Sequence, residues 1–304
     1  MEEVLWTTDL GKRYGDFWAL TGLDMHVPKG AIYGFVGKNG AGKTTLIRTI
    51  CGLQQPASGE YTLFGQKHTG AGIWKARRRM GALVETPSIY REMSAQDNLK
   101  AQYRMLGLPS FEGIDELLEL VGLTDAGRKK AKDFSLGMRQ RLGIAIALCG
   151  DPDFLVLDEP ANGLDPEGII EIRELILRLN QEQQITVLIS SHILDELARL
   201  ATHYGFIDHG RMVQEISARD LAAACRKCIR ITVSDILALA RVLEEAGIEY
   251  AVISEQEADI FGAVNISQLA LALAAEHCEV RSLERRDEGL ESYYLNLVGG
   301  GRYA

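Results

Sequence analysis

The sequence predicts an α/β protein with a mostly parallel central sheet, followed by a small α+β domain. Short apolar runs at 31–36, 154–157 and 185–189 have the unbroken hydrophobicity of strands that are covered on both faces. Helical patterns lie between these runs, and strands that alternate with helices form parallel sheets. The pattern restarts at Cys228, and 304 residues are enough for one large and one small domain.

A glycine-rich loop follows the first apolar run. Residues 37–44 read Gly-Lys-Asn-Gly-Ala-Gly-Lys-Thr and match the phosphate-binding pattern G-x-x-x-x-G-K-[ST] without a mismatch. A helix predicted over 44–51 points its N-terminus at this loop, where backbone N–H groups bind anions. Lys43 can reach the terminal phosphates, and the Thr44 hydroxyl can hold Mg²⁺. The predicted nucleotide contacts of this segment are Gly37, Asn39, Gly40, Ala41, Gly42, Lys43, Thr44 and Thr45.

Two carboxylates end the second apolar run. Asp158 and Glu159 directly follow residues 154–157. Ligands of parallel sheets bind at the carboxyl ends of the strands, so we expect both side chains to lie near the phosphate loop. Asp158 is predicted to hold Mg²⁺, directly or through water. Glu159 is a candidate general base for a hydrolytic water.

The composition and the charge of the chain argue against several classes of protein. Hydrophobic residues make up 46% of the chain and charged residues 25%, which is typical of a soluble globular protein. A net charge of −9 argues against a dedicated nucleic-acid-binding protein. The acidic N-terminus has no signal-peptide layout, and no apolar run approaches the ~18 residues that span a bilayer. We therefore expect a cytoplasmic protein whose membrane role, if any, depends on a partner.

The remaining elements are predicted from turn residues and hydrophobic periodicity. Residues 1–30 read as antiparallel strands that turn at Tyr14-Gly15-Asp16, and 54–65 as a turn and a strand. The pattern from 74 to 123 is mainly helical, with breaks at 81–88 and 106–109. Further elements are predicted at 136–148, 168–180 and 220–224 (helices) and 204–216 (a hairpin).

Three parts of the chain follow from this pattern. They are a nucleotide-binding domain at 1–217, a linker at 218–227 and a small domain at 228–304. The last part reads strand, helix, strand, strand, helix, strand, and then a final helix at 289–298. This order predicts a split βαβ sandwich.

The motifs together resemble the ATP-binding subunit of an ABC transporter, over residues 1 to about 217. Tyr14 resembles the aromatic residue on which adenine stacks, and His192 resembles the switch histidine that touches the γ-phosphate. Phe134-Ser135-Leu136-Gly137-Met138 resembles the signature Leu-Ser-Gly-Gly-Gln and keeps Ser135 and Gly137. The resemblance implies a P-loop ATPase fold with a mostly parallel core sheet, an antiparallel β subdomain and a helical subdomain that carries the signature.

One departure from the family pattern concerns Glu85. The family usually has a glutamine at this position, at the end of a strand that leads toward the membrane partner. A carboxylate is a better ligand for a hard cation than an amide, so Glu85 is a candidate Mg²⁺ ligand. Glu-x-Pro here resembles the E-loop of the subfamily that exports bacitracin- and lantibiotic-type peptides. A plain substitution without meaning for the substrate remains an alternative.

The resemblance implies Mg²⁺-dependent ATP hydrolysis by two copies of the chain that face each other head to tail. Lys43, Glu159 and His192 would be catalytic, and Ser135 and Gly137 would contact the nucleotide bound by the opposite copy. The dimer would drive a permease on another chain and so lie at the inner face of the membrane, without a nucleic-acid partner. The alternative is a soluble ABC ATPase that acts on ribosomes or DNA. Such proteins usually carry two cassettes or a long coiled-coil insertion, and neither is present in this sequence.

Overall fold

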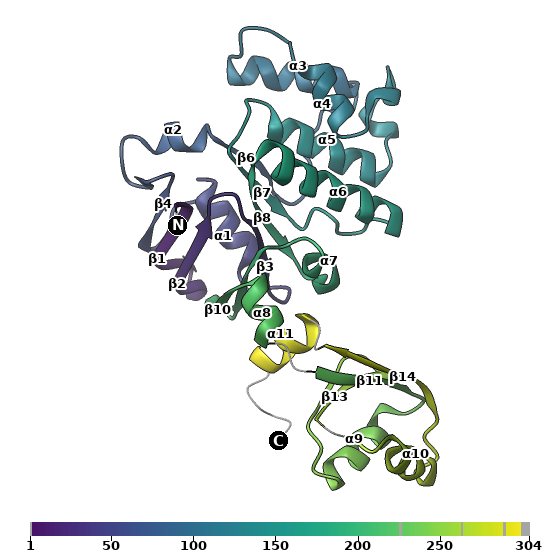
Figure 1. Ribbon diagram of the computed structural model, residues 1–304. Coiled ribbons are helices and arrows are strands. Elements are labelled where there is room, and N and C mark those ends of the chain that lie inside the picture. The colour runs from purple at the N-terminus through teal and green to yellow at the C-terminus, as the bar shows by residue number, and fades with distance from the viewer. Residues whose placement is uncertain (1, 225–226, 263, 288–289, 299–304) are drawn as a thin grey trace. The chain divides into compact units, whose positions relative to one another are not determined.

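The computed structural model describes residues 2–224, 227–262, 264–287 and 290–298 (Figure 1). The chain divides into two compact units, Met1–Ser217 and Ala218–Ala304. Each unit has its own sheet and its own hydrophobic core.

A six-stranded sheet forms the centre of the first unit. Its order is β10-β9-β3-β8-β7-β6, and β9, β3, β8, β7 and β6 run parallel, whereas β10 pairs antiparallel with β9. This confirms the prediction of a mostly parallel core sheet. The strands are β3 (Ile32–Val36), β6 (Met80–Leu83), β7 (Phe154–Asp158), β8 (Thr186–Ser191), β9 (His203–Asp208) and β10 (Arg211–Ser217).

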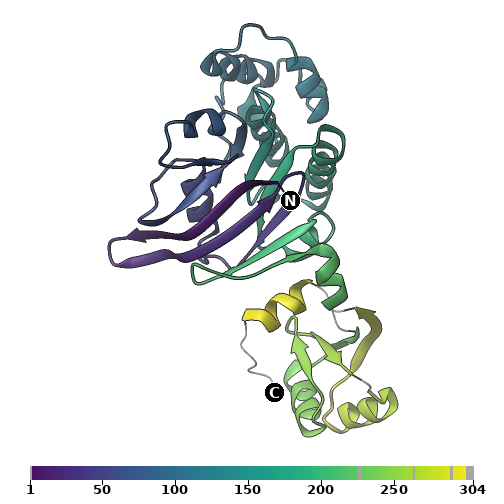
Figure 2. The same cartoon turned by 60° about the vertical axis from the view of Figure 1, so that its left-hand side comes forward.

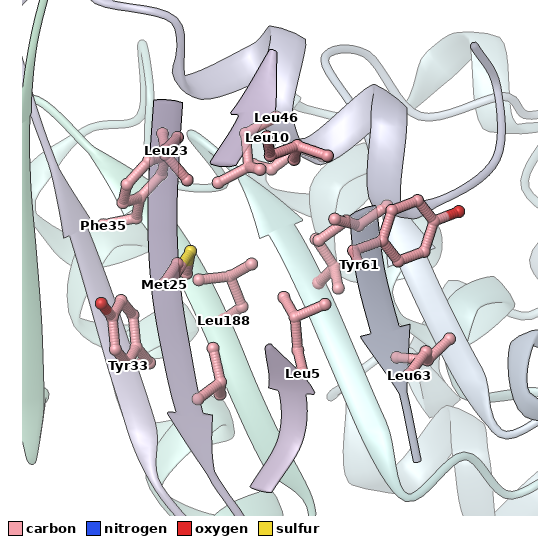
Figure 3. Packing of buried hydrophobic residues seen from close by; sticks show 14 of the residues in the cluster. Leu5, Leu10, Leu23, Met25, Tyr33, Phe35, Leu46, Tyr61, Leu63 and Leu188 are labelled. Carbon is pink, nitrogen blue, oxygen red and sulfur yellow. The ribbon is translucent and has the colours of Figure 1, made fainter. Parts of the chain in front are cut away.

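An antiparallel sheet packs beside the central sheet. Its order is β2-β1-β4-β5, with β1 (Glu3–Tyr14), β2 (Phe17–Pro28), β4 (Ser58–Leu63) and β5 (Gln66–Lys67). Figure 2 shows β1 and β2 as a long hairpin. Its buried side chains meet those of the central strands and of the first helix in one apolar cluster (Figure 3). The members labelled in Figure 3 are Leu5, Leu10, Leu23, Met25, Tyr33, Phe35, Leu46, Tyr61, Leu63 and Leu188.

Helices cover the central sheet and form a separate helical part. Helix α1 contacts β7 and β2, whereas α5 contacts β6 and α6 contacts β8. Helices α3 and α4 pack on each other and on α5, away from the antiparallel sheet (Figure 1). The helices are α1 (Lys43–Ile50), α2 (Ile73–Arg77), α3 (Ala95–Leu106), α4 (Ile114–Leu120), α5 (Leu136–Leu148), α6 (Pro166–Gln183) and α7 (Leu194–Ala198), with 3₁₀ turns η1 (Thr124–Ala126) and η2 (Ala131–Asp133).

The second unit is an α+β sandwich. Its antiparallel sheet has the order β12-β13-β11-β14. Helices α9 and α10 bury Leu239, Leu243, Leu269 and Leu273 in the same cluster as Ile231 and other sheet residues. The elements are α8 (Ala218–Ala224), β11 (Lys227–Val233), α9 (Ile236–Glu245), β12 (Tyr250–Val252), β13 (Glu257–Phe261), α10 (Ile266–Ala275), β14 (Val280–Asp287) and α11 (Leu290–Val298).

The segment expected to be a linker, 218–227, begins with α8, in which Leu221 is buried. Residues 225–226 lie outside the described residues. Within the part of the chain that the structure describes, no helix has the length and apolar character needed to cross a membrane.

A chain that ends at Ser217 should fold on its own, because the first unit keeps both of its sheets and its core. We expect soluble protein whose melting temperature lies within roughly 5 °C of the full-length value, a change of about 2 kcal/mol or less. Circular dichroism melting and gel filtration measure this.

The control is a chain that ends at Gly210 and lacks β10. It loses Glu215, which accepts hydrogen bonds from the buried Tyr33 hydroxyl and from the His26 backbone N–H. A buried hydroxyl without a partner destabilises a fold, so this control should melt at a clearly lower temperature. If the chain that ends at Ser217 aggregates, the first unit does not fold independently and the prediction is wrong.

Candidate functional site

The glycine-rich loop joins β3 to α1 at the carboxyl edge of the central sheet. Every residue of β3 is buried, and Leu46, Ile47 and Ile50 anchor α1 in the core. Gly42, at the N-cap of α1, has φ 113°, and a Cβ there would lie 2.8 Å from the Ala19 carbonyl oxygen. Only glycine fits this position, so the backbone turns its N–H groups toward the space before the helix.

A pocket of about 300 Å³ opens in front of this loop. Most of the predicted nucleotide contacts line it, which fits a phosphate ligand held by a loop and a helix N-terminus. Gly37 and Ala41 do not line it: the Gly37 carbonyl faces Lys43, and Ala41 is buried with its N–H on the Lys38 carbonyl. The lining residues are Tyr14, Phe17, Ala19, Lys38, Asn39, Gly40, Gly42, Lys43, Thr44, Thr45 and Glu159.

Lys43 is held by anionic and carbonyl groups of the chain itself. Its side chain is only 6% exposed. The ammonium donates to the Gly37 carbonyl oxygen, and its Nζ lies 3.2 Å from Oε1 of Glu159. A buried ammonium needs such partners, and the position of the Glu159 carboxylate shows that the pocket accepts an anion beside Lys43.

Glu159 links the phosphate loop to the predicted switch histidine. Its Oε2 lies 2.6 Å from Nδ1 of His192 and accepts from the His192 backbone N–H at 3.3 Å. Its backbone has φ 49°, a left-handed conformation that is unfavourable for a side chain with a Cβ. The structure thus brings Lys43, Glu159 and His192 together, as the sequence predicts. A carboxylate at this point of the pocket can take a proton from a water molecule beside the terminal phosphate.

Asp158 ends β7 and is 1% exposed. The Ser190 hydroxyl, at the end of the neighbouring strand β8, donates to its Oδ1 at 2.6 Å. The sequence did not single out Ser190, because its place beside Asp158 depends on the register between β7 and β8. A hydrogen-bonded carboxylate at a strand end is a suitable partner for a bound cation or for one of its water ligands.

These oxygen donors fit a cation that takes most of its ligands from water and substrate rather than from the protein. Thr44 lines the pocket with its hydroxyl-bearing side chain, and Asp158, which does not line it, offers a buried carboxylate at the end of β7. No group of three or more His, Cys, Asp or Glu side chains is arranged to hold a metal ion in the described parts of the chain. Mg²⁺ matches these hard oxygen donors, because it is usually held by one or two protein ligands, water and substrate phosphates.

The aromatic residue Tyr14 is held in place by a hydrogen bond of its hydroxyl group. Its hydroxyl donates to Oε1 of Gln54 at 2.6 Å, and Gln54 Nε2 donates to the Thr45 carbonyl at 2.9 Å. Phe17, 65% exposed, lines the same pocket as a second aromatic ring that the sequence analysis missed. Its place just after the hairpin turn, three residues from Tyr14, was the signal that could have identified it.

Glu85 does not line the pocket. Its backbone has φ 61°, and its Oε1 accepts from Nη2 of Arg48 on α1 at 2.6 Å. Both side chains are about half exposed. The carboxylate predicted as a metal ligand is therefore engaged by an arginine on the helix that follows the phosphate loop.

Ser135 and Gly137 lie in a different hollow, of about 510 Å³, which no residue of the phosphate loop lines. Ser135 caps α5 by accepting from the Met138 N–H at 3.2 Å, and Asp165 caps α6 in the same way through Gly168. One chain thus presents the signature segment and the phosphate pocket as two separate surfaces. This separation is what a nucleotide shared between two copies requires.

Burial raises the pKa of the Cys51 thiol, just after α1, to about 12; the charge of Arg77 lowers this pKa and that of Asp158 raises it. The thiol therefore stays protonated at neutral pH. Since the thiolate is the reactive form of cysteine, Cys51 is a packing residue rather than a nucleophile.

Comparison with known proteins gives consistent matches. Residues 20–162 match the ABC transporter family. The bacitracin transport ATP-binding protein BcrA of Bacillus licheniformis is 38% identical over 99% of both chains. The lantibiotic transport ATP-binding protein SrtF of Streptococcus pyogenes is 44% identical over 68% of this chain and 88% of its own. A bacterial ABC transporter cassette solved as a dimer has the same fold, with a TM-score of 0.64 and 24% identity over 71% of this chain and 99% of its own.

Glu159→Gln should increase nucleotide affinity while hydrolysis falls by roughly 100-fold or more. The amide keeps the shape of the side chain but no longer neutralises Lys43, and it cannot take a proton from water. Fluorescence titration with a labelled ATP analogue measures affinity, and phosphate release measures turnover. Glu182→Gln, a charge change at an exposed position of α6, is the control and should change neither value. Unchanged affinity of Glu159→Gln would show that the carboxylate does not compete with nucleotide.

Proposed function

The chain belongs to the ATP-binding proteins of ABC transporters, a family that hydrolyses ATP, and we propose that it drives a separate membrane permease for a peptide antibiotic. We further propose that hydrolysis requires Mg²⁺ and that the transported molecule is of the bacitracin or lantibiotic type, exported to give immunity. The observation that supports ATP hydrolysis in this proposal is the position of Glu159 between Lys43 and His192 at the phosphate pocket.

Each group around the pocket has a role in this reaction. Lys43 leaves its contacts with Gly37 and Glu159 to neutralise phosphate charge, and His192 donates to the terminal phosphate. Glu159, freed from these two partners, accepts the proton of the attacking water. Thr44 and Asp158 would hold Mg²⁺, which would supply positive charge next to the phosphates. Tyr14 and Phe17 provide flat apolar surfaces for the base.

Glu85 has a conditional role in this scheme. It would serve the cation only after its carboxylate leaves Arg48, which holds it in the present conformation. A hydrogen-bonded exposed ion pair contributes little to stability, so such a change is energetically accessible. We propose that Glu85 links the nucleotide site to the permease through the loop that follows β6.

A second copy of the chain is the proposed partner in nucleotide binding. The hollow at Ser135 and Gly137 contains the N-terminus of α5, which suits a phosphate group brought by the other copy. The dimeric cassette of the same fold supports this arrangement. Each site is then incomplete in one chain.

The substrate class rests on similarity over the whole length of the chain. BcrA aligns with 99% of this chain, including the second unit, and SrtF aligns with 68% of it. Both are named for transport of peptide antibiotics. These matches favour a transporter subunit over a soluble ATPase that acts on ribosomes or DNA. The chain would then lie at the cytoplasmic face of the membrane through its permease.

Lys43→Ala tests the activity and the transport role together. Loss of the ammonium leaves phosphate charge without its main partner, so ATP affinity should fall by at least roughly 100-fold and hydrolysis should stop. Cells that carry the variant with the permease that copurifies with the chain should lose resistance to bacitracin or to a lantibiotic.

The control is Lys67→Ala, which removes a surface lysine paired with Glu60. It should keep both ATPase activity and resistance. Normal turnover of Lys43→Ala would refute the nucleotide site. Loss of turnover without any change in resistance to a panel of such peptides would refute only the substrate class.

Mixing two inactive variants tests the shared site. In a mixed dimer of Lys43→Ala and Ser135→Arg chains, one of the two sites combines an intact Lys43 with an intact Ser135. Each variant alone offers no such site. Mixing should therefore restore part of the ATPase activity, measured by phosphate release. If each chain held a complete site by itself, the mixture would stay as inactive as its components.

A further inference from the structure

Ser190 contacts both acidic residues of the site, Asp158 and Glu159. It is not among the residues that the sequence singles out. It is the fifth residue of β8, and Asp158 is its register partner in the parallel strand β7. Its side chain is 0% exposed. A hydroxyl that is withdrawn from water at this place needs partners within the protein.

The Ser190 hydroxyl has a partner on each side. It donates to Oδ1 of Asp158 at 2.6 Å and accepts from the Glu159 backbone N–H at 3.0 Å. The same N–H also reaches the Ser190 carbonyl oxygen at 3.1 Å. A single side chain is thus bonded to the side chain of Asp158 and to the backbone of Glu159.

These contacts determine where both acidic side chains point. Asp158 is buried, and a hydrogen bond to one of its oxygens limits rotation of the carboxylate about its χ angles. Glu159 contacts Lys43 and His192 from a left-handed backbone conformation, φ 49°. Such a conformation costs about 1–3 kcal/mol and persists only where surrounding contacts hold it. The bond from Glu159 N–H to Ser190 is one of those contacts.

We propose that Ser190 is a positioning residue that orients Asp158 toward the bound cation and Glu159 toward the attacking water. The inference rests on the proposed Mg²⁺-dependent ATPase activity. Groups that orient metal ligands from behind typically change metal affinity or activity by 10–100-fold when they are removed. Ser190→Ala should therefore weaken divalent-cation binding by roughly this factor and lower kcat rather than raise the KM for ATP.

Three readouts test this. Mn²⁺ binding in the presence of a non-hydrolysable ATP analogue is measured by electron paramagnetic resonance. ATPase activity is measured as a function of Mg²⁺ and of ATP. The ¹⁵N chemical shift of the His192 imidazole, recorded without metal or nucleotide, reports whether Nδ1 still meets the Glu159 carboxylate. Ser190→Ala should change all three, and Ser190→Cys, which keeps the volume but donates weakly, should give a smaller change in each.

Thr186→Val is the matched control. Thr186 lies on the same strand, is equally buried, and accepts from the Gly30 N–H at 2.9 Å at the opposite end of β8. Its loss should lower the melting temperature and leave the Mn²⁺ affinity, the kcat and the His192 shift unchanged. If Ser190→Ala and Ser190→Cys behave like Thr186→Val, Ser190 is structural only and the inference is wrong. A wild-type chain that neither hydrolyses ATP nor binds Mn²⁺ with the analogue would refute the proposed function instead.

Discussion

The parallel alignment of β3, β7 and β8 is the constraint on which the site depends. Val36 pairs with Ser191 and Asp158 pairs with Ser190, so the three strands end at nearly the same level. The phosphate loop follows β3, His192 follows β8, and the acidic pair Asp158 and Glu159 lies at the end of β7. Residues more than a hundred positions apart in the sequence, such as Lys43 and Glu159, thereby meet in one pocket. The apolar cluster of Figure 3, which packs on this sheet, keeps the alignment rigid.

The site concentrates features that are individually unfavourable. Lys43 and Asp158 are nearly buried, and charged groups in such places need bonded partners. Glu85 and Glu159 both have positive φ, and both follow a strand of the central sheet closely. Each carboxylate forms an ion pair with a basic residue: Glu85 pairs with Arg48, and Glu159 pairs with Lys43. Strained backbone at such positions is typical of parts that change conformation when a ligand arrives.

Local motifs made several residues of the candidate site predictable. Lys43, Asp158 and Glu159 belong to short patterns next to apolar runs, and the structure places them where parallel strands end. Ser190, Phe17 and Arg48 were not predicted, because their roles depend on strand register, hairpin geometry and a contact across 37 residues. The alternation after Cys228 predicted the elements of the second unit. The strand order β12-β13-β11-β14 agrees with the predicted split βαβ arrangement, because β13 lies between β11 and β12, and β11 lies between β13 and β14.

The contact between Lys43 and Glu159 has a consequence for the nucleotide cycle. The Glu159 carboxylate competes with phosphate groups for Lys43. Because it belongs to the same chain, its local concentration does not depend on the concentration of the protein. Every phosphate-bearing ligand must displace it, so the apparent dissociation constant rises by the reciprocal of the fraction of chains in which Lys43 is free. In the proposed reaction, Glu159 can pair with Lys43 again once it has released the proton taken from the attacking water. This contact would therefore favour release of the spent nucleotide, because it offers Lys43 another anionic partner.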